Sequence, residues 1–425
     1  MIFILFGVFL LTLFSGFPIA FCLGLSSLSY VLFTDIPLAI IPQKIYAGID
    51  VFVLLCIPGF ILAGNLMNRG GITDRIIDFS NAVLGHIRGG LGLANVGASM
   101  IFAGISGTAV ADTASIGAVM IPGMAKKGYE VDFSCAVTAS SSTIGPIIPP
   151  SLPMIIAGTL TGLSVAKLFI AGAIPGILLG VGLMAVSYGI SVKRQHPKGR
   201  RQSLRAIFQK FIGAFWALFM TVVILVGIVG GIFTPTEASV VAVLYAVFVG
   251  LFIYRDLNLR EIPSILIETA VTSSSLMVLV GLANLFGWIL TSEQIPQAIA
   301  EGMLSVTQNK YAILLLINLL LLFVGTFMET IAALIILFPV LLKVAVSVGV
   351  DPIHFAIIAV LNLMIGLTTP PVGVCLFVAS SIGKIPLGKM SRAILPFLAV
   401  SLLVLLLVTY VPQFSLLLPQ LVFSR

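Results

Sequence analysis

Charged residues are scarce in this chain. Only 9% of its 425 residues are charged and 59% are hydrophobic, whereas a soluble globular protein carries about 25% charged residues. A chain with so little charge cannot cover a water-facing surface, so most of its surface must face lipid. The composition excludes an ordinary soluble protein and, with its long apolar runs, predicts an all-α integral membrane protein.

Residue patterns that build catalytic, redox or metal centres are also missing. The four cysteines lie inside apolar runs without CxxC spacing, and the three histidines are scattered. There is no GxSxG, HExxH or GxxxxGK[ST] motif, so esterase, zinc-protease and ATPase functions have no support. The N-terminal apolar stretch lacks a basic leading region and a small-residue cleavage site, so we do not expect a cleaved signal peptide. The sequence therefore predicts a protein that is not an enzyme.

What the chain does contain is a series of apolar segments long enough to cross a bilayer, which takes about 20 residues each. About ten full spans are expected, at residues 1–15, 17–34, 51–68, 133–158, 166–192, 211–232, 237–254, 264–290, 354–381 and 393–411. Two more apolar stretches, 90–125 and 312–348, are interrupted near their middles and are expected to form re-entrant helical hairpins. Residues 72–88 and 293–305 are amphipathic, which is typical of helices lying along the interface.

The lysines and arginines test this arrangement. If the basic loop 193–210 is cytoplasmic, the alternation of spans places 17 of the 22 basic residues on the cytoplasmic side. Those left outside are Lys44, Lys167, Lys310, Lys343 and Arg425. This bias agrees with the positive-inside rule, and it explains the net charge of +7 by contact with anionic membrane lipid rather than nucleic acid. Both termini are then expected on the periplasmic side.

An internal repeat relates the two halves of the chain. Residues match at an offset of 217 (Pro18 with Pro235, Asp112 with Glu329, Pro122 with Pro339) and then at 221 (Gly128 with Gly349, Ser141 with Asn362, Gly145 with Gly366, Pro149-Pro150 with Pro370-Pro371). The repeats are expected at 1–210 and 211–425. Each half has an odd number of full spans, so the second half should be inverted relative to the first, an architecture that many secondary transporters share.

Four segments combine polar residues with helix breakers at membrane depth: 104–117, 140–151, 324–332 and 362–373. Proline removes a backbone donor and breaks a helix, and the freed carbonyls cannot stay bare in hydrocarbon. They must line a cavity or bind a cation, and nearby hydroxyls would make good sodium ligands. Helix N-termini would favour an anionic substrate. The simpler interpretation is that these are kinks whose freed backbone groups bond to neighbouring helices. Four such segments, paired by the repeat, favour a site that binds an ion or a substrate.

Three acidic residues stand out in these apolar surroundings. Asp112 and Glu329 could take up protons, bind a cation or substrate, or order the hairpin tips. As a pair they could in principle form the acid dyad of an intramembrane hydrolase. Glu237 follows Thr234-Pro235-Thr236, which predicts a helix start with a capping hydroxyl and an acid near the positive end of the helix dipole.

The segments 104–117, 145–151, 231–239 and 368–373 resemble the large membrane (permease) subunit of the TRAP (tripartite ATP-independent periplasmic) transporters, and the resemblance covers nearly the whole chain. It implies an elevator-type fold in the bacterial inner membrane, in which the hairpins and broken spans form a transport domain and the remaining spans a scaffold. It further implies a sodium gradient as the energy source and no organic cofactor. It also implies a separate small four-span membrane subunit and a periplasmic substrate-binding protein. Substrates of such permeases are small organic anions such as C4-dicarboxylates or sialic acid, and the chain resembles the sialic-acid type.

The resemblance also implies site residues. A first sodium site would involve Ser106, Gly107, Gly145, Ile148 and Pro149, and a second Gly325, Thr326, Gly366, Thr369 and Pro370. The substrate would lie near Asp112, Thr113, Ser141, Ser142, Glu329 and Asn362. A proton-coupled anion transporter is the alternative; in that case the two acids gain importance. A passive channel has little support because nothing marks a filter ring.

Overall fold

The secondary structure is helical, as the composition predicted. The computed structural model describes residues 2–34, 36–307 and 309–423, and it describes their side chains except at 104–106, 296, 300 and 303–306. Within these residues the only extended pairing is an isolated bridge between Arg88 and Lys198. The all-α fold class is therefore confirmed.

The described residues of the first half form eleven helical elements. They are α1 (Ile2–Phe14), α2 (Ile19–Leu32), α3 (Ile40–Ile49), the 3-10 helix η1 (Phe52–Leu55), α4 (Cys56–Arg69), α5 (Ile72–Leu84), α6 (Gly90–Ser106), α7 (Ala109–Lys126), α8 (Val131–Ser142), α9 (Leu152–Thr161) and α10 (Val165–Lys193). Helices α6 and α7 form the first predicted hairpin. The span predicted at 133–158 is broken into α8 and α9.

The second half repeats this order. Its elements are α11 (Leu204–Val229), α12 (Pro235–Phe248), the π-helical turn η2 (Val249–Tyr254), the 3-10 turn η3 (Leu259–Glu261), α13 (Ile262–Ser292), α14 (Ile295–Val306), α15 (Lys310–Phe327), α16 (Thr330–Ser347), α17 (Pro352–Gly366), α18 (Val374–Gly383), α19 (Leu387–Tyr410) and α20 (Gln413–Phe423). Helices α15 and α16 form the second hairpin, and the span predicted at 354–381 is broken into α17 and α18.

The helix boundaries correct one detail of the predicted repeat. Helices α7 and α16 begin at 109 and 330 and end at 126 and 347, so the hairpins are related by an offset of 221 rather than 217. Asp112 therefore lies in the first turn of α7, whereas Glu329 is the residue before α16, equivalent in position to Thr108. The match of Asp112 with Glu329, and of Pro122 with Pro339, was a coincidence in a chain rich in proline. The inverted orientation of the halves stays a prediction.

The number of full spans also differs from the expected ten. Eight helices in the described part of the chain are long and apolar enough to cross a membrane. Six of them match predicted spans, and the other two are α15 and α16 of the second hairpin. The first two predicted spans are short helices of 13 and 14 residues. The two double-proline spans are not among the eight, because the interruption divides each into two shorter helices.

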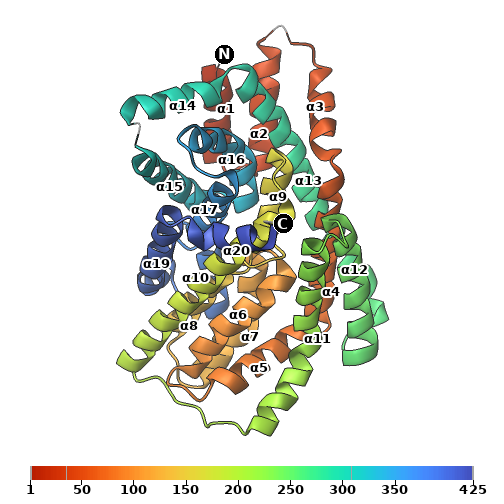
Figure 1. Ribbon diagram of the computed structural model, residues 1–425, viewed down its shortest axis with the longest axis vertical. Helices are drawn as coiled ribbons and strands as arrows, with labels where there is room; N and C mark the ends of the chain where they lie inside the picture. Colours follow the sequence, from red (N-terminus) through yellow and green to blue (C-terminus); the bar gives the residue numbers. More distant parts are fainter. Residues whose placement is uncertain (1, 35, 308, 424–425) are drawn as a thin grey trace.

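The helices pack in two groups. We call α1–α4 and α11–α13 the scaffold group, because α12 packs on α4 and α13 packs on α2, α3 and α4; α6–α10 and α15–α20 form the hairpin group, and α5 and α14 each contact both groups. In Figure 1, α4, α11, α12 and α13 run along the right side, whereas α8, α10, α15 and α19 lie on the left. The closing spans α10 and α19, expected in the scaffold, pack against each other, α6, α8 and α17, and thus group with the hairpins.

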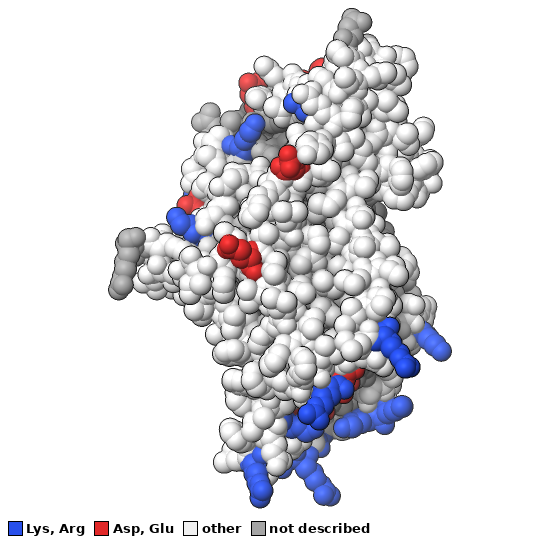
Figure 2. All heavy atoms as spheres, turned by 90° about the vertical axis from the view of Figure 1, so that its right-hand side faces the viewer, with Lys and Arg blue, Asp and Glu red and all other residues white. Residues whose placement is uncertain are grey.

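The amphipathic segments and the charges lie at the ends of the molecule. Helices α5 and α14 lie near opposite ends of its long axis (Figure 1). Figure 2 shows that lysines and arginines gather at the lower end, where the loop between α10 and α11 runs in Figure 1. Helix α5 buries Ile72, Ile76 and Ile77 on one face, so one side of it packs on the protein and the other carries polar residues.

The predicted start of α12 is confirmed in detail. The Thr234 side chain accepts a hydrogen bond from the backbone N–H of Glu237 at 3.2 Å, and the Glu237 carboxylate accepts from the backbone N–H of Thr234 at 2.8 Å. Pro235 occupies the first helical position. This reciprocal capping box satisfies two otherwise unpaired donors.

Candidate functional site

The tip of the first hairpin meets the break in the first broken span. Gly107 ends α6 in the left-handed conformation, with φ of +66°, and a Cβ there would lie 3.3 Å from Leu152 Cγ at the start of α9. Gly145, inside the break, lies against the Asp112 carboxylate, since a Cβ on it would be 2.1 Å from Asp112 Oδ2. Ser151 caps α9 by accepting from Met154 N, and its hydroxyl donates to the Pro146 carbonyl.

The second hairpin meets the second break by a similar contact between backbones. A Cβ on Gly366 would lie 2.6 Å from Gly325 Cα, so only glycines allow this approach. Beside it, the backbone N–H of Gly373 donates to the Thr326 carbonyl at 3.1 Å. The Pro149-Pro150 and Pro370-Pro371 peptide bonds are both cis. The structure thus places Gly325 and Thr326 against the second break and Gly107 beside the start of α9, next to the first break. The Ser106 side chain lies outside the described residues, and sodium binding by either set stays a prediction.

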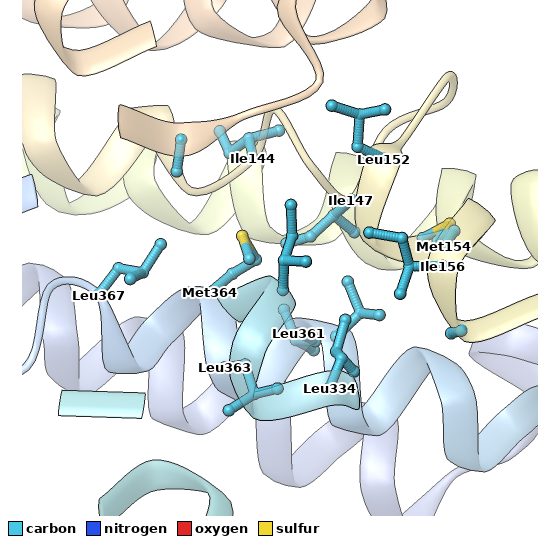
Figure 3. Close-up of a cluster of buried hydrophobic side chains, with 14 of the residues drawn as sticks. Ile144, Ile147, Leu152, Met154, Ile156, Leu334, Leu361, Leu363, Met364 and Leu367 are labelled. Atoms are coloured by element: carbon cyan, nitrogen blue, oxygen red, sulfur yellow. The ribbon is translucent and has the colours of Figure 1, made fainter. Parts of the chain in front are cut away.

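The two hairpin units are also joined to each other. Helix α7 packs against α8 of its own half and α18 of the other half, and α16 packs against α17 of its own half and α9 of the other. Between the breaks, apolar side chains from both halves form one buried cluster (Figure 3). Ile144 and Ile147 of the first break lie in this cluster together with Leu361 and Met364 of α17. This cluster keeps water away, which strengthens electrostatic interactions at the adjacent backbone.

Both breaks leave backbone oxygens without hydrogen bonds. Among the residues that the structure describes, no hydrogen bond reaches the carbonyl oxygens of three predicted ligands in each site. They are Gly145, Ile148 and Pro149 in the first, and Gly325, Thr369 and Pro370 in the second. Bare carbonyls away from water cost several kcal/mol each, to order of magnitude, and oxygen atoms are the ligands that hard cations prefer. The donor set therefore fits a sodium ion.

The two acids of the hairpins have different surroundings. Glu329 accepts hydrogen bonds from the backbone N–H groups of Ile331 (2.9 Å) and Ala332 (3.3 Å), so it caps α16 and orders the second tip. Asp112 is fully buried and lies close to Gly145 and to Cys375 of α18. One acid thus stabilises its own helix end, while the other lies where the two halves of the chain meet.

The polar side chains predicted to contact substrate are buried and engaged within the protein. The hydroxyls of Thr113 and Ser142 donate to the carbonyls of Ala109 and Thr138 in their own helices. Ser141 accepts from Ser99 at 2.8 Å. Asn362 donates to the Asn318 side chain at 2.8 Å, and Asn318 donates to Thr409. The Ser99–Ser141 and Asn318–Asn362 contacts tie each hairpin to its broken span; substrate contact by these residues stays a prediction.

A polar cleft that the sequence reasoning missed lies between the two helix groups. It is a cavity of about 180 Å³ lined by α4 and α13 of the scaffold group and by α6 and α7 of the first hairpin. Its polar lining comprises Asn65, Asn68, Thr108, Ser115, Glu268 and Thr272. The sequence does indicate this cleft: residues 268–275 read ETAVTSSS within a predicted span, and Asn65 and Asn68 lie near the end of another. Polar residues in spans are usually functional.

Solved structures of transporters share this fold. The Alcanivorax borkumensis YdaH transporter superposes with a TM-score of 0.58 over 94% of this chain and 89% of its own, at 16% identity. The Neisseria gonorrhoeae efflux pump MtrF gives 0.54 over 88% and 83%, at 14% identity. The chain therefore has the fold of a multi-pass membrane transporter.

Sequence comparison defines the family. Residues 6–414 match the family model of the tripartite ATP-independent periplasmic transporter, DctM component, and the chain belongs to this family. The sialic acid TRAP transporter large permease protein SiaM of Vibrio cholerae is 44% identical over 96% of both chains. The C4-dicarboxylate TRAP transporter large permease protein DctM of Pseudomonas aeruginosa is 44% identical over 94% of this chain and 93% of its own. These relatives are named as permeases, not enzymes, which removes the intramembrane hydrolase.

Proposed function

We propose that this chain is the large permease subunit of a tripartite system that takes up a small organic acid across the bacterial inner membrane, driven by a sodium gradient. The observation that carries the sodium assignment is the set of unpaired carbonyl oxygens at the two breaks, each of which packs against a hairpin tip. Gly145, Ile148 and Pro149 would hold one ion, and Gly325, Thr369 and Pro370 the other. A bound cation would supply positive charge beside the substrate.

The substrate class is proposed from the relatives and from the site. Three relatives are named for sialic acid, C4-dicarboxylate and isethionate, and all of these substrates are acids. An organic anion gains from sodium ions bound nearby and from exposed helix N-termini. The two cations proposed at the breaks would therefore attract a carboxylate or sulfonate substrate.

The proposed mechanism is an elevator movement of the hairpin group along the scaffold group. Its support is the way the helices pack in two groups whose interface encloses cavities of about 180 and 140 Å³. Interfaces with cavities forfeit dispersion contacts, so these surfaces are less firmly fixed than the cores of each group. The closing helices α10 and α19 would travel with the hairpins.

The orientation and the partners complete the proposal. The basic end of the molecule (Figure 2) would face the cytoplasm, where anionic lipid attracts it, and both termini would be periplasmic. A small four-span membrane subunit would accompany the scaffold group. A periplasmic substrate-binding protein would deliver the acid.

Uptake in proteoliposomes tests the whole proposal. The chain is reconstituted with the small subunit and supplied with the binding protein loaded with radiolabelled succinate, isethionate or N-acetylneuraminate. We expect saturable uptake that requires an inward sodium gradient and the binding protein. Uptake driven by a proton gradient in sodium-free buffer would reject sodium coupling and support the proton-coupled alternative, in which Asp112 and Glu329 carry the protons.

A further inference from the structure

The polar cleft between the scaffold group and the first hairpin is built from two helix faces. Asn65 and Asn68 are three residues apart on α4, and Glu268 and Thr272 are four apart on α13, spacings that place each pair on one helix face. Ser115 of α7 closes the cleft from the hairpin side. Polar groups of both helix groups therefore converge on one cavity.

The hydrogen bonds inside the cleft leave donors available. The Asn65 amide nitrogen donates to Thr269 Oγ1 at 3.0 Å, and the Asn68 amide nitrogen donates to Ser115 Oγ at 2.9 Å. Each amide nitrogen carries two hydrogens, so each retains one after these contacts. Ser115 accepts in its contact with Asn68 and keeps its own hydroxyl hydrogen to donate. Three neutral donors therefore line one small cavity.

The rim of the cleft carries charges of both signs. Glu268 lies 3.9 Å from the Arg69 guanidinium, and both side chains are 56% exposed. At this distance the pair is loose, so most of the five donors of Arg69 stay open to another acid. The guanidinium also offsets the charge of Glu268, so an anion entering the cleft does not meet an isolated carboxylate.

We propose that this cleft is the subsite for the acid group of the transported substrate, with Asn65, Asn68 and Ser115 donating hydrogen bonds to its carboxylate or sulfonate. The inference rests on the proposed function and deepens it. Neutral donors hold an anion without the tight charge pairing that would slow its release, and transport requires that a substrate can leave. The volume of about 180 Å³ is below the roughly 300–1,000 Å³ of pockets that enclose drug-sized ligands. The cleft therefore takes the acid end.

The Asn68–Ser115 contact gives this subsite a position in the transport cycle. It joins α4 of the scaffold group to α7 of the hairpin group, so the donors converge only while these two helices are adjacent. A sliding hairpin group would disperse them and release the acid. The subsite would therefore exist in one of the two end states of transport.

Isosteric replacement of the neutral donors by carboxylates tests the subsite. Asn65→Asp and Asn68→Asp replace a donor with an anionic acceptor of the same size, and Thr269 and Ser115 can still donate to them. The matched control is Asn258→Asp, because Asn258 is exposed and caps η3 by accepting from Arg260 N, a role that aspartate performs equally well. Binding of succinate, isethionate and N-acetylneuraminate is measured by calorimetry on the chain with its small subunit in nanodiscs, in saturating sodium.

We expect the dissociation constant for the bound acid to rise at least about tenfold in Asn65→Asp and Asn68→Asp, since each variant loses a hydrogen bond to a charged group and gains a like charge. It should stay within about twofold in Asn258→Asp. The sodium concentration that half-saturates thermal stabilisation should be unchanged in all three, which shows that they fold. If an acidic variant does not fold, Asn65→Ala replaces it, and its dissociation constant for the acid should also rise.

Two negative results have separate meanings. Parent-like acid binding and uptake in the Asn65 and Asn68 variants would overturn the subsite and leave the proposed function standing. A parent protein that binds and transports none of the three acids would overturn the proposed function, and the subsite with it.

Discussion

Replacing Gly366 by alanine is the sharpest test of the second break. A Cβ at this position would lie 2.6 Å from both Cα and the carbonyl carbon of Gly325. The obstructing atoms are backbone, so no rotation of a side chain relieves the clash. The tip of the second hairpin must therefore separate from α17, and it carries the unpaired Gly325 carbonyl with it.

The magnitude follows from the distances. Ordinary van der Waals contact begins at about 3.4 Å, so the two backbones must move apart by about 0.8 Å. Ligands at metal sites keep their distances within about 0.2 Å, so the proposed sodium site would lose a ligand. We expect the half-saturating sodium concentration to rise at least about tenfold, equivalent to about 1.4 kcal/mol. Overpacking should also cost about 1–3 kcal/mol of stability.

The assay is sodium-dependent thermal stabilisation of the purified protein, followed by sodium-dependent uptake in proteoliposomes. The matched control is Gly123→Ala in α7, because Gly123 is a helical glycine and a Cβ added to it would meet no atom within 4 Å. This variant should keep the sodium response and gain up to about 1 kcal/mol of stability. A Gly366→Ala protein that is destabilised but responds to sodium like the parent would refute the assignment of this break as a sodium site.

Three further predictions address the ends and the interface of the molecule. The pKa of the Glu130 carboxyl lies below its ordinary value of 4.5: burial by itself would raise it, but the hydrogen bond to His196 and nearby positive charge outweigh burial. The stability that this group contributes should be complete above about pH 4.5 and be lost as pH falls through the lowered pKa. Glu130→Gln should therefore reduce the fall of the melting temperature at acidic pH, and an unchanged fall would reject the pairing with His196. Thr234→Ala should lower the free energy of unfolding by about 1 kcal/mol, and Thr234→Ser should recover most of it in denaturation assays; equal stability of both variants would contradict the cap. Val51→Cys and Leu160→Cys place cysteines on opposite sides of the second cavity between the two groups; in a chain without its native cysteines, they should let a short reducible bifunctional thiol reagent stop uptake until reductant is added. Undiminished uptake after cross-linking would exclude sliding at this interface.

Sequence patterns that act locally were sufficient for much of the fold. The scarcity of charge required a lipid-facing surface, and each double proline removed donors from one helix, so the breaks after α8 and α17 could be placed from residues alone. Thr234 and Glu237 are three residues apart, so their capping box was readable as well. In each case the physical cause lies within a few residues of its effect.

Contacts between distant segments were decided only by the tertiary structure. The offset of the hairpins depends on where α7 and α16 begin, and Pro122 and Pro339 gave a false match because proline is frequent in this chain. The packing of α10 and α19 with the hairpins could not be read from two uniformly apolar helices, whose hydrophobicity fits either group.

The amino-acid sequence by itself determined that this protein lies in a membrane and where its helices break. The tertiary structure decided which helices those breaks meet, and that Asn68 of the scaffold group faces Ser115 of the hairpin. Hydrophobic periodicity and proline placement act along the chain, whereas a cleft forms from side chains that are far apart in sequence and come together only by packing.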